Sequence, residues 1–192
     1  MVWLEVETKI KLKDSEVPEF RKNIKKIGIF EKKCEKIDNY FAIQRKSKKY
    51  PKKAFRIRSL GDKYQINFKR PLKKFWTKEI VVKHEFEFYL KGKSERDSLI
   101  ELFQDLGFTK WIEKIKFNET YLWKKDKRVS IEINKVKNLG YFIEIEYLVQ
   151  ENEIEKAKSS IKKVLKELNI RPEQINNKGY TKMLWEMGKS KI

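Results

Sequence analysis

Residues 2–12 have the sequence VWLEVETKIKL, in which apolar and charged side chains alternate along almost the whole segment. Successive side chains of a β-strand point to opposite faces, so this period of two predicts a strand with one apolar and one charged face. The apolar face carries Val2, Leu4, Val6, Ile10 and Leu12, and the charged face carries Glu5, Glu7, Lys9 and Lys11. The charged face must therefore either meet water or line a ligand site.

The same period recurs along the chain and is interrupted by a few helical segments. We expect further strands at residues 30–41, 54–60, 63–69, 79–91, 111–123, 128–136 and 141–149, with a turn at Gly61-Asp62. Helices are expected at residues 15–27, 94–106, 152–168 and 180–187. Gly28 and Gly107 should end the first two helices, and Ser94 with Asp97 resembles a capping box. Because helices do not follow every strand, a mostly antiparallel sheet with helices packed outside fits this order better than a doubly wound parallel sheet.

Lysine dominates the composition. The 192 residues include 47 Lys and Arg against 28 Asp and Glu, a formal net charge of +19. This charge attracts polyanions, but a lysine-rich proteome from a hot environment would show it too, so nucleic acid, polyphosphate and surface bias all stay open. Cys34 is the only cysteine, which favours a reducing, cytoplasmic location. No apolar stretch approaches the ~18 residues of a membrane span, so we expect one domain over residues 1–192 and no membrane partner.

Pairs of like charges two residues apart recur on the predicted strands. The acidic pairs are Glu5/Glu7, Glu85/Glu87 and Glu144/Glu146, and the basic pairs are Arg56/Arg58 and Lys114/Lys116. Residues two apart on a strand share a face and lie within ~7 Å of each other. A single pair of this kind is most simply explained as part of a strand face that is exposed to water. Several pairs, each opposite a bulky apolar face, indicate instead that the charged faces turn inward together, as a barrel of about eight strands around a small ligand would allow.

A charged interior is stable only if its charges are paired or bind ions. Carboxylate pairs suit hard cations such as Mg²⁺ or Mn²⁺, which prefer oxygen ligands. Arginine binds phosphate oxygens through two parallel hydrogen bonds, and lysine binds them as a point charge. Both sets together match a metal-complexed polyphosphate, and phosphoryl transfer needs little beyond such positioning and charge stabilisation.

An ordered series of motifs resembles the CYTH domain of the triphosphate tunnel metalloenzymes. E-x-E-x-K lies at residues 5–9, D-x-Y-F at residues 38–41, R-x-R at residues 56–58, and the lysine of the next strand is Lys69. KHEFE at residues 83–87 resembles R-x-E-x-E, and Lys114 with Lys116 resembles K-x-R. LGYFIEIE at residues 139–146 matches L-G-x-F-x-E-x-E, and GYTKML at residues 179–184 resembles the terminal S-Y-T-x-L-L element. The D-x-Y-F and L-G-x-F-x-E-x-E segments are most similar to the class IV adenylyl cyclase (CyaB-type) branch.

The resemblance implies an α+β fold: a closed eight-stranded antiparallel β-barrel, the triphosphate tunnel, with helices packed outside. It also implies Mg²⁺ or Mn²⁺ as cofactor and divides the charged residues among three tasks. The triphosphate-binding set is Lys9, Arg56, Arg58, Lys69, Lys83, Lys114 and Lys116. The metal-binding set is Glu5, Glu7, Glu144 and Glu146. The catalytic set is Glu85, Glu87 and Lys9, of which the two glutamates would orient the basic residues or a metal-bound water.

The chain departs from the family pattern at three positions. Lys83 and Lys116 stand where arginine is more usual, which keeps the charge but loses the planar fork. Asn134 stands about where many members have an acidic residue, and its carbonyl oxygen is the weaker ligand.

Two reactions fit the expected tunnel. In a cyclase, the ribose 3′-hydroxyl of ATP attacks the α-phosphorus and pyrophosphate leaves; in a triphosphatase, water attacks the terminal phosphorus of tripolyphosphate, thiamine triphosphate or a nucleotide. The resemblance slightly favours the cyclase, and no motif recognises adenine. A non-catalytic polyphosphate- or RNA-binding module is a third interpretation. It leaves the acidic pairs unexplained, because carboxylates repel phosphate unless a metal intervenes, and this argues against nucleic acid as the partner.

Three other features have simple interpretations. His84 shares a strand face with Phe86 and Phe88, so we expect a packed or surface histidine rather than a base or ligand. Nothing near Cys34 suggests a nucleophile. The basic loop at residues 45–53 either is solvated charge or gathers anionic substrate at a tunnel mouth. The resembled family includes dimers, so a homodimer is left open.

Overall fold

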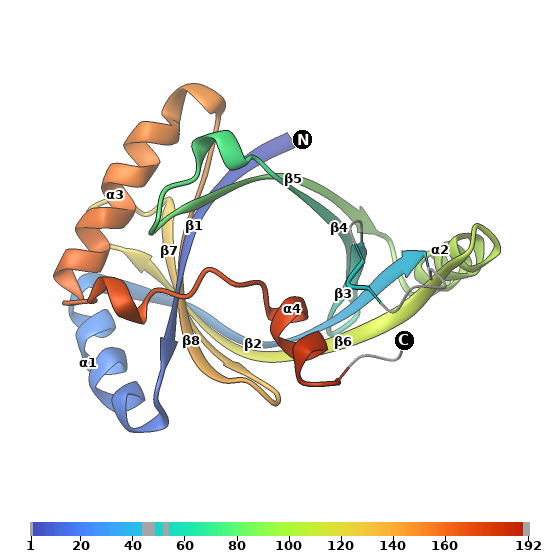
Figure 1. Cartoon of the computed structure of the whole chain (residues 1–192), viewed down its shortest axis with the longest axis horizontal. Helices are drawn as coiled ribbons and strands as arrows, with labels where there is room; N and C mark the ends of the chain where they lie inside the picture. Colours follow the sequence, from blue (N-terminus) through green and yellow to red (C-terminus); the bar gives the residue numbers. More distant parts are fainter. Residues whose placement is uncertain (1, 44–48, 52–53, 190–192) are drawn as a thin grey trace.

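The computed structural model describes residues 2–43, 49–51 and 54–189, and its centre is a closed barrel (Figure 1). The strands are β1 (Val2–Leu12), β2 (Gly28–Ile43), β3 (Phe55–Leu60), β4 (Lys63–Pro71), β5 (Val81–Leu90), β6 (Phe108–Trp123), β7 (Val129–Val136) and β8 (Gly140–Val149). Around the barrel they follow the order β1-β5-β4-β3-β2-β6-β7-β8, and each neighbouring pair is antiparallel. The predicted α+β class and closed eight-stranded antiparallel barrel are therefore confirmed.

The first three helices lie outside the barrel wall, whereas the C-terminal helix lies within its outline near β6 (Figure 1). They are α1 (Val17–Ile27), α2 (Lys93–Asp105), α3 (Ile154–Glu167) and α4 (Tyr180–Glu186). The apolar stripe of α3, which includes the fully buried Ile161 and Val164, packs in one core with the outward side chains of β1 and β8. Each such aliphatic side chain stabilises the fold by roughly 1.5–3 kcal/mol on burial. Because the apolar faces of the strands are used outside in this way, their charged faces are left inside.

The segment after α3 returns to the barrel and is fastened to β1. Ile175 forms a β-bridge with Ile10, and the Asn176 backbone N–H donates a hydrogen bond of 2.7 Å to the Lys9 carbonyl. The Lys9 backbone N–H donates in turn to Asn177 Oδ1 at 2.8 Å. From there the chain enters α4, whose first residue, Tyr180, packs against Phe142 of β8. The C-terminal helix is thus held beside the part of β1 that carries Lys9.

Glycines end elements for different reasons. Gly61 and Gly107 have φ angles of +60° and +84°, the left-handed region expected for the hairpin turn and for the end of α2. Gly28 does follow the last residue of α1, as predicted, but with φ −117° it is extended rather than left-handed. A Cβ atom there would lie 3.0 Å from Cβ of Tyr121. Gly28 is therefore required for the close approach of β2 to β6.

The predicted capping box at Ser94 is wrong. Helix α2 begins at Lys93, so Ser94 lies within its first turn, and the N-cap residue Gly92 provides no side-chain hydrogen bond. Instead Glu95 Oε2 accepts a hydrogen bond of 2.8 Å from the backbone N–H of Lys91. A carboxylate one position after Ser94 therefore satisfies the backbone at the start of the helix.

Three expectations concern the periphery. Residues 45–48 and 52–53 of the expected basic loop lie outside the described residues, whereas Tyr50 and Pro51 line the interior cavity. Strands β2 and β6 extend beyond their predicted ends and pair along most of their length. Within the described ranges, none of the helices combines the length and apolar character that crossing a bilayer requires.

Candidate active site

The interior of the barrel is a charged cavity of about 800 Å³ to which all eight strands contribute side chains. Its basic lining residues are Lys9, Lys36, Arg56, Arg58, Lys69, Arg70, Lys83, Lys114 and Lys116. Its acidic lining residues are Glu5, Glu7, Glu85, Glu87, Glu132, Glu144 and Glu146. All the residues of the three predicted sets therefore face one enclosed space, as the strand period required.

Three carboxylates gather at one point of this cavity. One oxygen from each of Glu5, Glu7 and Glu146 lies within 4.8 Å of the others. Glu5 and Glu7 are two residues apart on β1, and Glu146 of β8 is the ladder partner of Glu7. Burial, and then the negative charge of Glu5, raise the pKa of Glu146 well above its usual value. Proximity of like charges in a buried place is unfavourable without a cation.

The carboxylate cluster fits a hard divalent metal ion. Mg²⁺ and Mn²⁺ prefer oxygen ligands, and three carboxylates supply them from a rigid pair of strands. Glu5 Oε1 is buried without a hydrogen-bond partner, although the Lys83 ammonium lies 3.5 Å from it. An unpaired buried carboxylate oxygen is the atom that a metal ion would satisfy.

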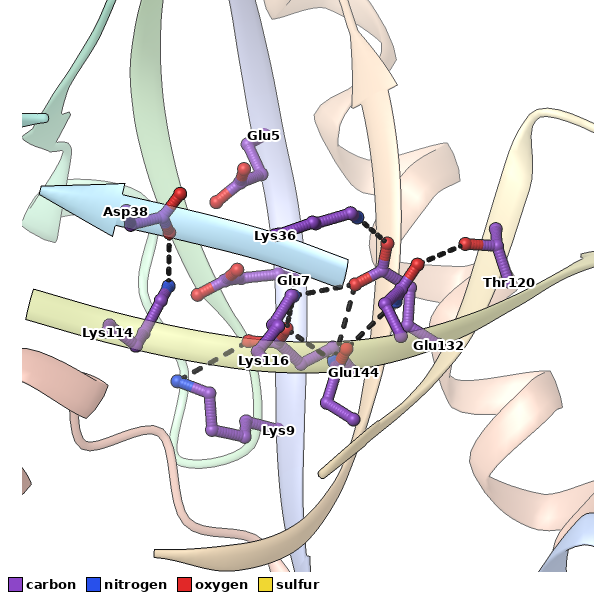
Figure 2. A network of polar contacts seen from close by, with 12 residues as sticks. Glu5, Glu7, Lys9, Lys36, Asp38, Lys114, Lys116, Thr120, Glu132 and Glu144 are labelled. Atoms are coloured by element: carbon purple, nitrogen blue, oxygen red, sulfur yellow. Dashed lines mark hydrogen bonds and ion pairs between the residues drawn. The ribbon is translucent and has the colours of Figure 1, made fainter. Parts of the chain in front are cut away.

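Glu144 belongs to a different group of contacts. Lys116 Nζ donates a hydrogen bond of 2.9 Å to Glu144 Oε2, and Lys9 Nζ lies 3.6 Å from Oε1 (Figure 2). Asn134 Nδ2 also donates to Glu144 Oε2, at 2.8 Å. Burial opposes ionisation, but Lys116 and Lys9 outweigh it and lower the pKa of Glu144 to about 2. Its carboxylate is therefore held by cations rather than by the cluster of three, and its assignment as a metal ligand stays a prediction.

Asn134 has a defined structural place. Its Oδ1 accepts a hydrogen bond of 2.8 Å from Asn118, while its Nδ2 donates to Glu144. Both ends of the amide are thus in use. At this position the chain thus has a group that orients the Glu144 carboxylate, in place of the acidic residue that the resemblance implies.

A buried aspartate holds three of the predicted triphosphate-binding residues. Asp38 accepts from Arg58 Nε at 2.6 Å, and its Oδ2 lies 2.7 Å from Lys114 Nζ and 3.3 Å from Arg56 Nη1. Figure 2 shows the Lys114 pair, in which the two side chains approach from neighbouring strands β6 and β2. Burial would raise the pKa of Asp38, but the three cations hold it well below its usual value. Asp38 thus stays ionised and fixes the basic side chains in place.

The other predicted residues link the carboxylate cluster to the cations. Lys69 forms an ion pair with Glu5, and Lys83 forms one with Glu7. The Glu85 carboxylate lies 3.3 Å from Lys69 Nζ and 3.9 Å from the Arg56 guanidinium. Glu87, for its part, accepts a hydrogen bond from Gln65. Glu85 is thus placed to orient basic residues, the role that the resemblance implies for it, although that role stays a prediction.

Four residues of the cavity region were missed or left without a role. The D-x-Y-F motif includes Asp38 and the GYTKML segment includes Tyr180, but neither residue was assigned a role. Glu132 and Lys36 were not considered, although Lys36 Nζ and Lys116 Nζ each lie 2.9 Å from a Glu132 oxygen. The period of two along β7 places Glu132 on the same face as Asn134, and that signal was available in the sequence.

His84 is packed on the barrel surface, as expected, and Cys34 has no contact that suggests a nucleophile. His84 Nδ1 is 2.8 Å from Arg70 Nη2, and its ring lies 4.7 Å from that of Phe86 on the outward side of β5. Cys34 is half-buried, with Sγ 3.8 Å from Asn118 Oδ1. Among the described residues, neither of the two belongs to the cavity lining.

Comparisons with known proteins agree with this geometry. A family model described as CYTH domain matches residues 4–180. A Methanocaldococcus jannaschii protein named "Putative adenylate cyclase" is 28% identical over 182 residues, which are 94% of this chain and 98% of the relative. A solved Pyrococcus horikoshii protein, PH1819, is 27% identical with a TM-score of 0.75, over 95% of this chain and 99% of that one.

A plant structure is more distant. The Hippeastrum protein, whose description reads "Putative adenylyl cyclase" and reports a dominant triphosphatase activity, has a TM-score of 0.62 at 16% identity. The match covers 97% of this chain and 96% of that chain. At this identity the likeness shows the fold alone.

Proposed function

The chain belongs to the CYTH family, and from that premise we propose that residues 1–192 form a single CYTH domain that binds a small-molecule triphosphate with Mg²⁺ or Mn²⁺ and catalyses phosphoryl transfer. One observation carries the proposal: the cluster of Glu5, Glu7 and Glu146 faces the same cavity as a wall of lysines and arginines. A purely anion-binding cavity would not need clustered carboxylates, and a purely metal-binding one would not need the cations. A metal-complexed triphosphate needs both.

The ion pairs within the cavity suggest how its charged groups change partners when the ligand binds. Within the cavity, Lys69 and Lys83 neutralise Glu5 and Glu7. Binding of a metal ion by those carboxylates would release both lysines, which would then bind phosphate oxygens. Lys69 and Lys83 would thus pair with the glutamates before binding and with phosphate oxygens afterwards. The buried charges would therefore have partners of opposite charge in both states.

The proposed division of labour follows from these contacts. Glu5, Glu7 and Glu146 hold the metal, which when bound polarises phosphoryl oxygens and neutralises developing charge. Arg56, Arg58 and Lys114, fixed by Asp38, bind the phosphates together with Lys69, Lys83 and Lys116. Glu85 orients Lys69 and Arg56. Lys9 Nζ, which lies 3.6 Å from Glu144, would bind phosphate oxygens as a cation, and its place in the catalytic set stays a prediction.

Adenylyl cyclase is the first candidate reaction. The 3′-oxygen of ATP would bond to the α-phosphorus, the bond from that phosphorus to the bridging oxygen would break, and pyrophosphate would leave. Support comes from the name of the archaeal relative, which aligns over nearly its whole length. The class IV adenylyl cyclase-like motifs at residues 38–41 and 139–146 agree with it.

Triphosphatase is the second candidate. Water would attack the terminal phosphorus of tripolyphosphate, thiamine triphosphate or a nucleoside triphosphate, and the same metal cluster and cations would serve. The observation that favours it is the Hippeastrum protein, whose description combines a cyclase name with a dominant triphosphatase activity on the same fold. The two reactions differ in the nucleophile, a ribose hydroxyl or water, and in the phosphorus that it attacks.

A substrate panel separates the proposals. ATP, tripolyphosphate and thiamine triphosphate would each be incubated with Mg²⁺ and with Mn²⁺. Cyclic AMP with pyrophosphate identifies the cyclase, whereas ADP with phosphate, or cleavage of the non-nucleotide substrates, identifies the triphosphatase. Binding of tripolyphosphate without turnover of any substrate would support the non-catalytic module instead.

Variants test the metal assignment. Glu5→Gln and Glu7→Gln should abolish metal-dependent turnover while the fold is kept. Glu155→Gln on α3 makes the same change at a side chain that is 82% exposed, and it should turn over like the wild type. If Glu5→Gln and Glu7→Gln also turn over normally, the proposed metal site is wrong.

A further inference from the structure

Tyr180 is a buried tyrosine whose hydroxyl has no partner. It is the first residue of α4, it lines the cavity and only 6% of its surface is exposed. Its Oη is buried and makes no hydrogen bond within the described residues. A buried hydroxyl without a partner costs free energy, so the few that occur in proteins call for an explanation.

The ring of Tyr180 is fixed, so the position of its hydroxyl is fixed too. Phe142 meets the ring edge to face at 4.9 Å between centroids, and Val136 and Met183 complete the apolar contact. The segment that leads into α4 is fastened to β1 by the hydrogen bonds between Lys9 and residues 176 and 177. Tyr180 and Lys9 are therefore parts of one rigid unit.

Two lysine ammonium groups lie against the ring of Tyr180. Lys9 Nζ lies 4.1 Å from the ring centroid and Lys114 Nζ lies 5.2 Å from it. Burial, and then the carboxylate of Glu144 close to the hydroxyl, raise the pKa of Tyr180, although this contact does not reach the geometry of a hydrogen bond. Glu144 already accepts hydrogen bonds from Lys116 and Asn134. The hydroxyl thus lacks an acceptor in a place where two cations would attract one.

We propose that the Tyr180 hydroxyl donates a hydrogen bond to a phosphoryl oxygen of the bound triphosphate, beside Lys9 and Lys114. This inference rests on the proposed function, because Lys9 and Lys114 belong to the triphosphate-binding set. The buried hydroxyl would gain its acceptor when the lysines next to it exchange their carboxylate partners for phosphate. Tyr180 is then a binding residue supplied by the C-terminal helix, in addition to the charged residues of the barrel.

The variant Tyr180→Phe tests this directly, since it removes one oxygen atom and keeps the ring contacts. Its thermal midpoint in the absence of ligand should equal or exceed that of the wild type, because an unpaired buried hydroxyl has been removed. Its dissociation constant for tripolyphosphate at saturating Mg²⁺ should rise roughly 10- to 150-fold, the range for a hydrogen bond to a charged group.

Tyr147→Phe is the matched control. The Tyr147 hydroxyl donates to Asp126 Oδ2 at 2.7 Å on the outer side of the barrel, so its loss should lower the thermal midpoint and leave tripolyphosphate binding unchanged. The two variants are thus expected to show opposite patterns. A purely structural role for Tyr180 would instead lower its midpoint, as for Tyr147, and that result overturns the proposal.

Binding by the wild type and by Arg56→Ala separates this inference from the proposed function. If the wild type binds tripolyphosphate, Arg56→Ala weakens it and Tyr180→Phe binds like the wild type, only the role of Tyr180 is refuted. If the wild type fails to bind, or Arg56→Ala binds equally well, the proposed tunnel function fails and the inference fails with it. Weaker binding by Tyr180→Phe with an unchanged or higher midpoint supports both.

Discussion

Replacing Asp38 with asparagine should be the most destabilising single change to the charged interior. Asp38 is fully buried and contacts Arg58, Lys114 and Arg56 at 2.6, 2.7 and 3.3 Å. Asn keeps the shape but removes the negative charge, so three buried or half-buried cations lose the anion they share. Removing one partner of a buried ion pair costs about 3–5 kcal/mol, and we expect a loss in that range.

Urea unfolding and thermal unfolding both measure the effect. For a domain of this size, 1 kcal/mol corresponds to roughly 2–4 °C in the midpoint, so the expected shift is roughly 6–20 °C. Asp97→Asn is the matched control, because Asp97 forms a surface pair with the neighbouring Arg96 and its side chain is 45% exposed. Surface substitutions of this kind change stability by about 0.5 kcal/mol or less.

The pH dependence adds a second criterion. The folded-state pKa of Asp38 lies well below its ordinary value of 3.8, so its stabilising contribution is fully present above pH 3.8 and is lost as the pH falls towards the folded-state value. The difference in unfolding free energy between wild type and Asp38→Asn should therefore shrink below pH 3.8. A loss under about 1 kcal/mol at neutral pH would refute the reasoning, because it would mean that solvent or other anions already compensate the three cations.

Three further predictions concern the metal, the triphosphate and the core. The affinity for Mn²⁺ should rise with pH in calorimetric titrations, because the pKa of Glu146 is raised and metal binding must displace its proton. In Glu146→Gln the part of the pH dependence that comes from this proton should disappear. An equal dependence of Mn²⁺ affinity on pH in both proteins would contradict the assignment. Arg56→Ala should weaken binding of tripolyphosphate roughly 10- to 150-fold, since one charge-assisted contact is lost, and should weaken binding of monophosphate much less. Equal effects on the two ligands would place Arg56 outside the phosphate site. Ile161→Ala should lower the unfolding free energy measured in urea by about 2–5 kcal/mol, because Ile161 lies on the fully buried face of α3. Lys162→Ala on the exposed face of the same helix should change it little. A similarly small effect of both substitutions would show that α3 is not part of the core.

The architecture was predictable because the strand period is local. Leu4, Val6 and Ile10 alternate with Glu5, Glu7 and Lys9, so a short segment of sequence already separates the outer face of β1 from its inner face. The ends of β2 and β6 were not predictable in this way. Their additional residues, such as Ile29 and Ala42, gain strand structure from ladder partners across the barrel, which lie far away in the sequence.

The site was predictable as a set of residues but not as a set of contacts. The motifs gave Arg56, Arg58 and Lys114, yet the role of Asp38 depends on the register that places it opposite Arg58 on β3 and Lys114 on β6. Register is a tertiary property, and sequence periodicity alone does not specify which residues face each other. The same holds for Tyr180, which reaches the cavity only because the C-terminal segment is fastened to β1.

A crystal structure of the protein grown with Mn²⁺ and tripolyphosphate tests the central claim most directly, because anomalous scattering locates manganese independently of the phasing model. The account predicts a manganese peak within coordination distance of Glu5, Glu7 and Glu146, with the polyphosphate chain inside the barrel against Arg56, Lys69 and Lys114. Manganese and polyphosphate bound only to lysines and carboxylates on the outer surface, with the interior ion pairs unchanged, would contradict it.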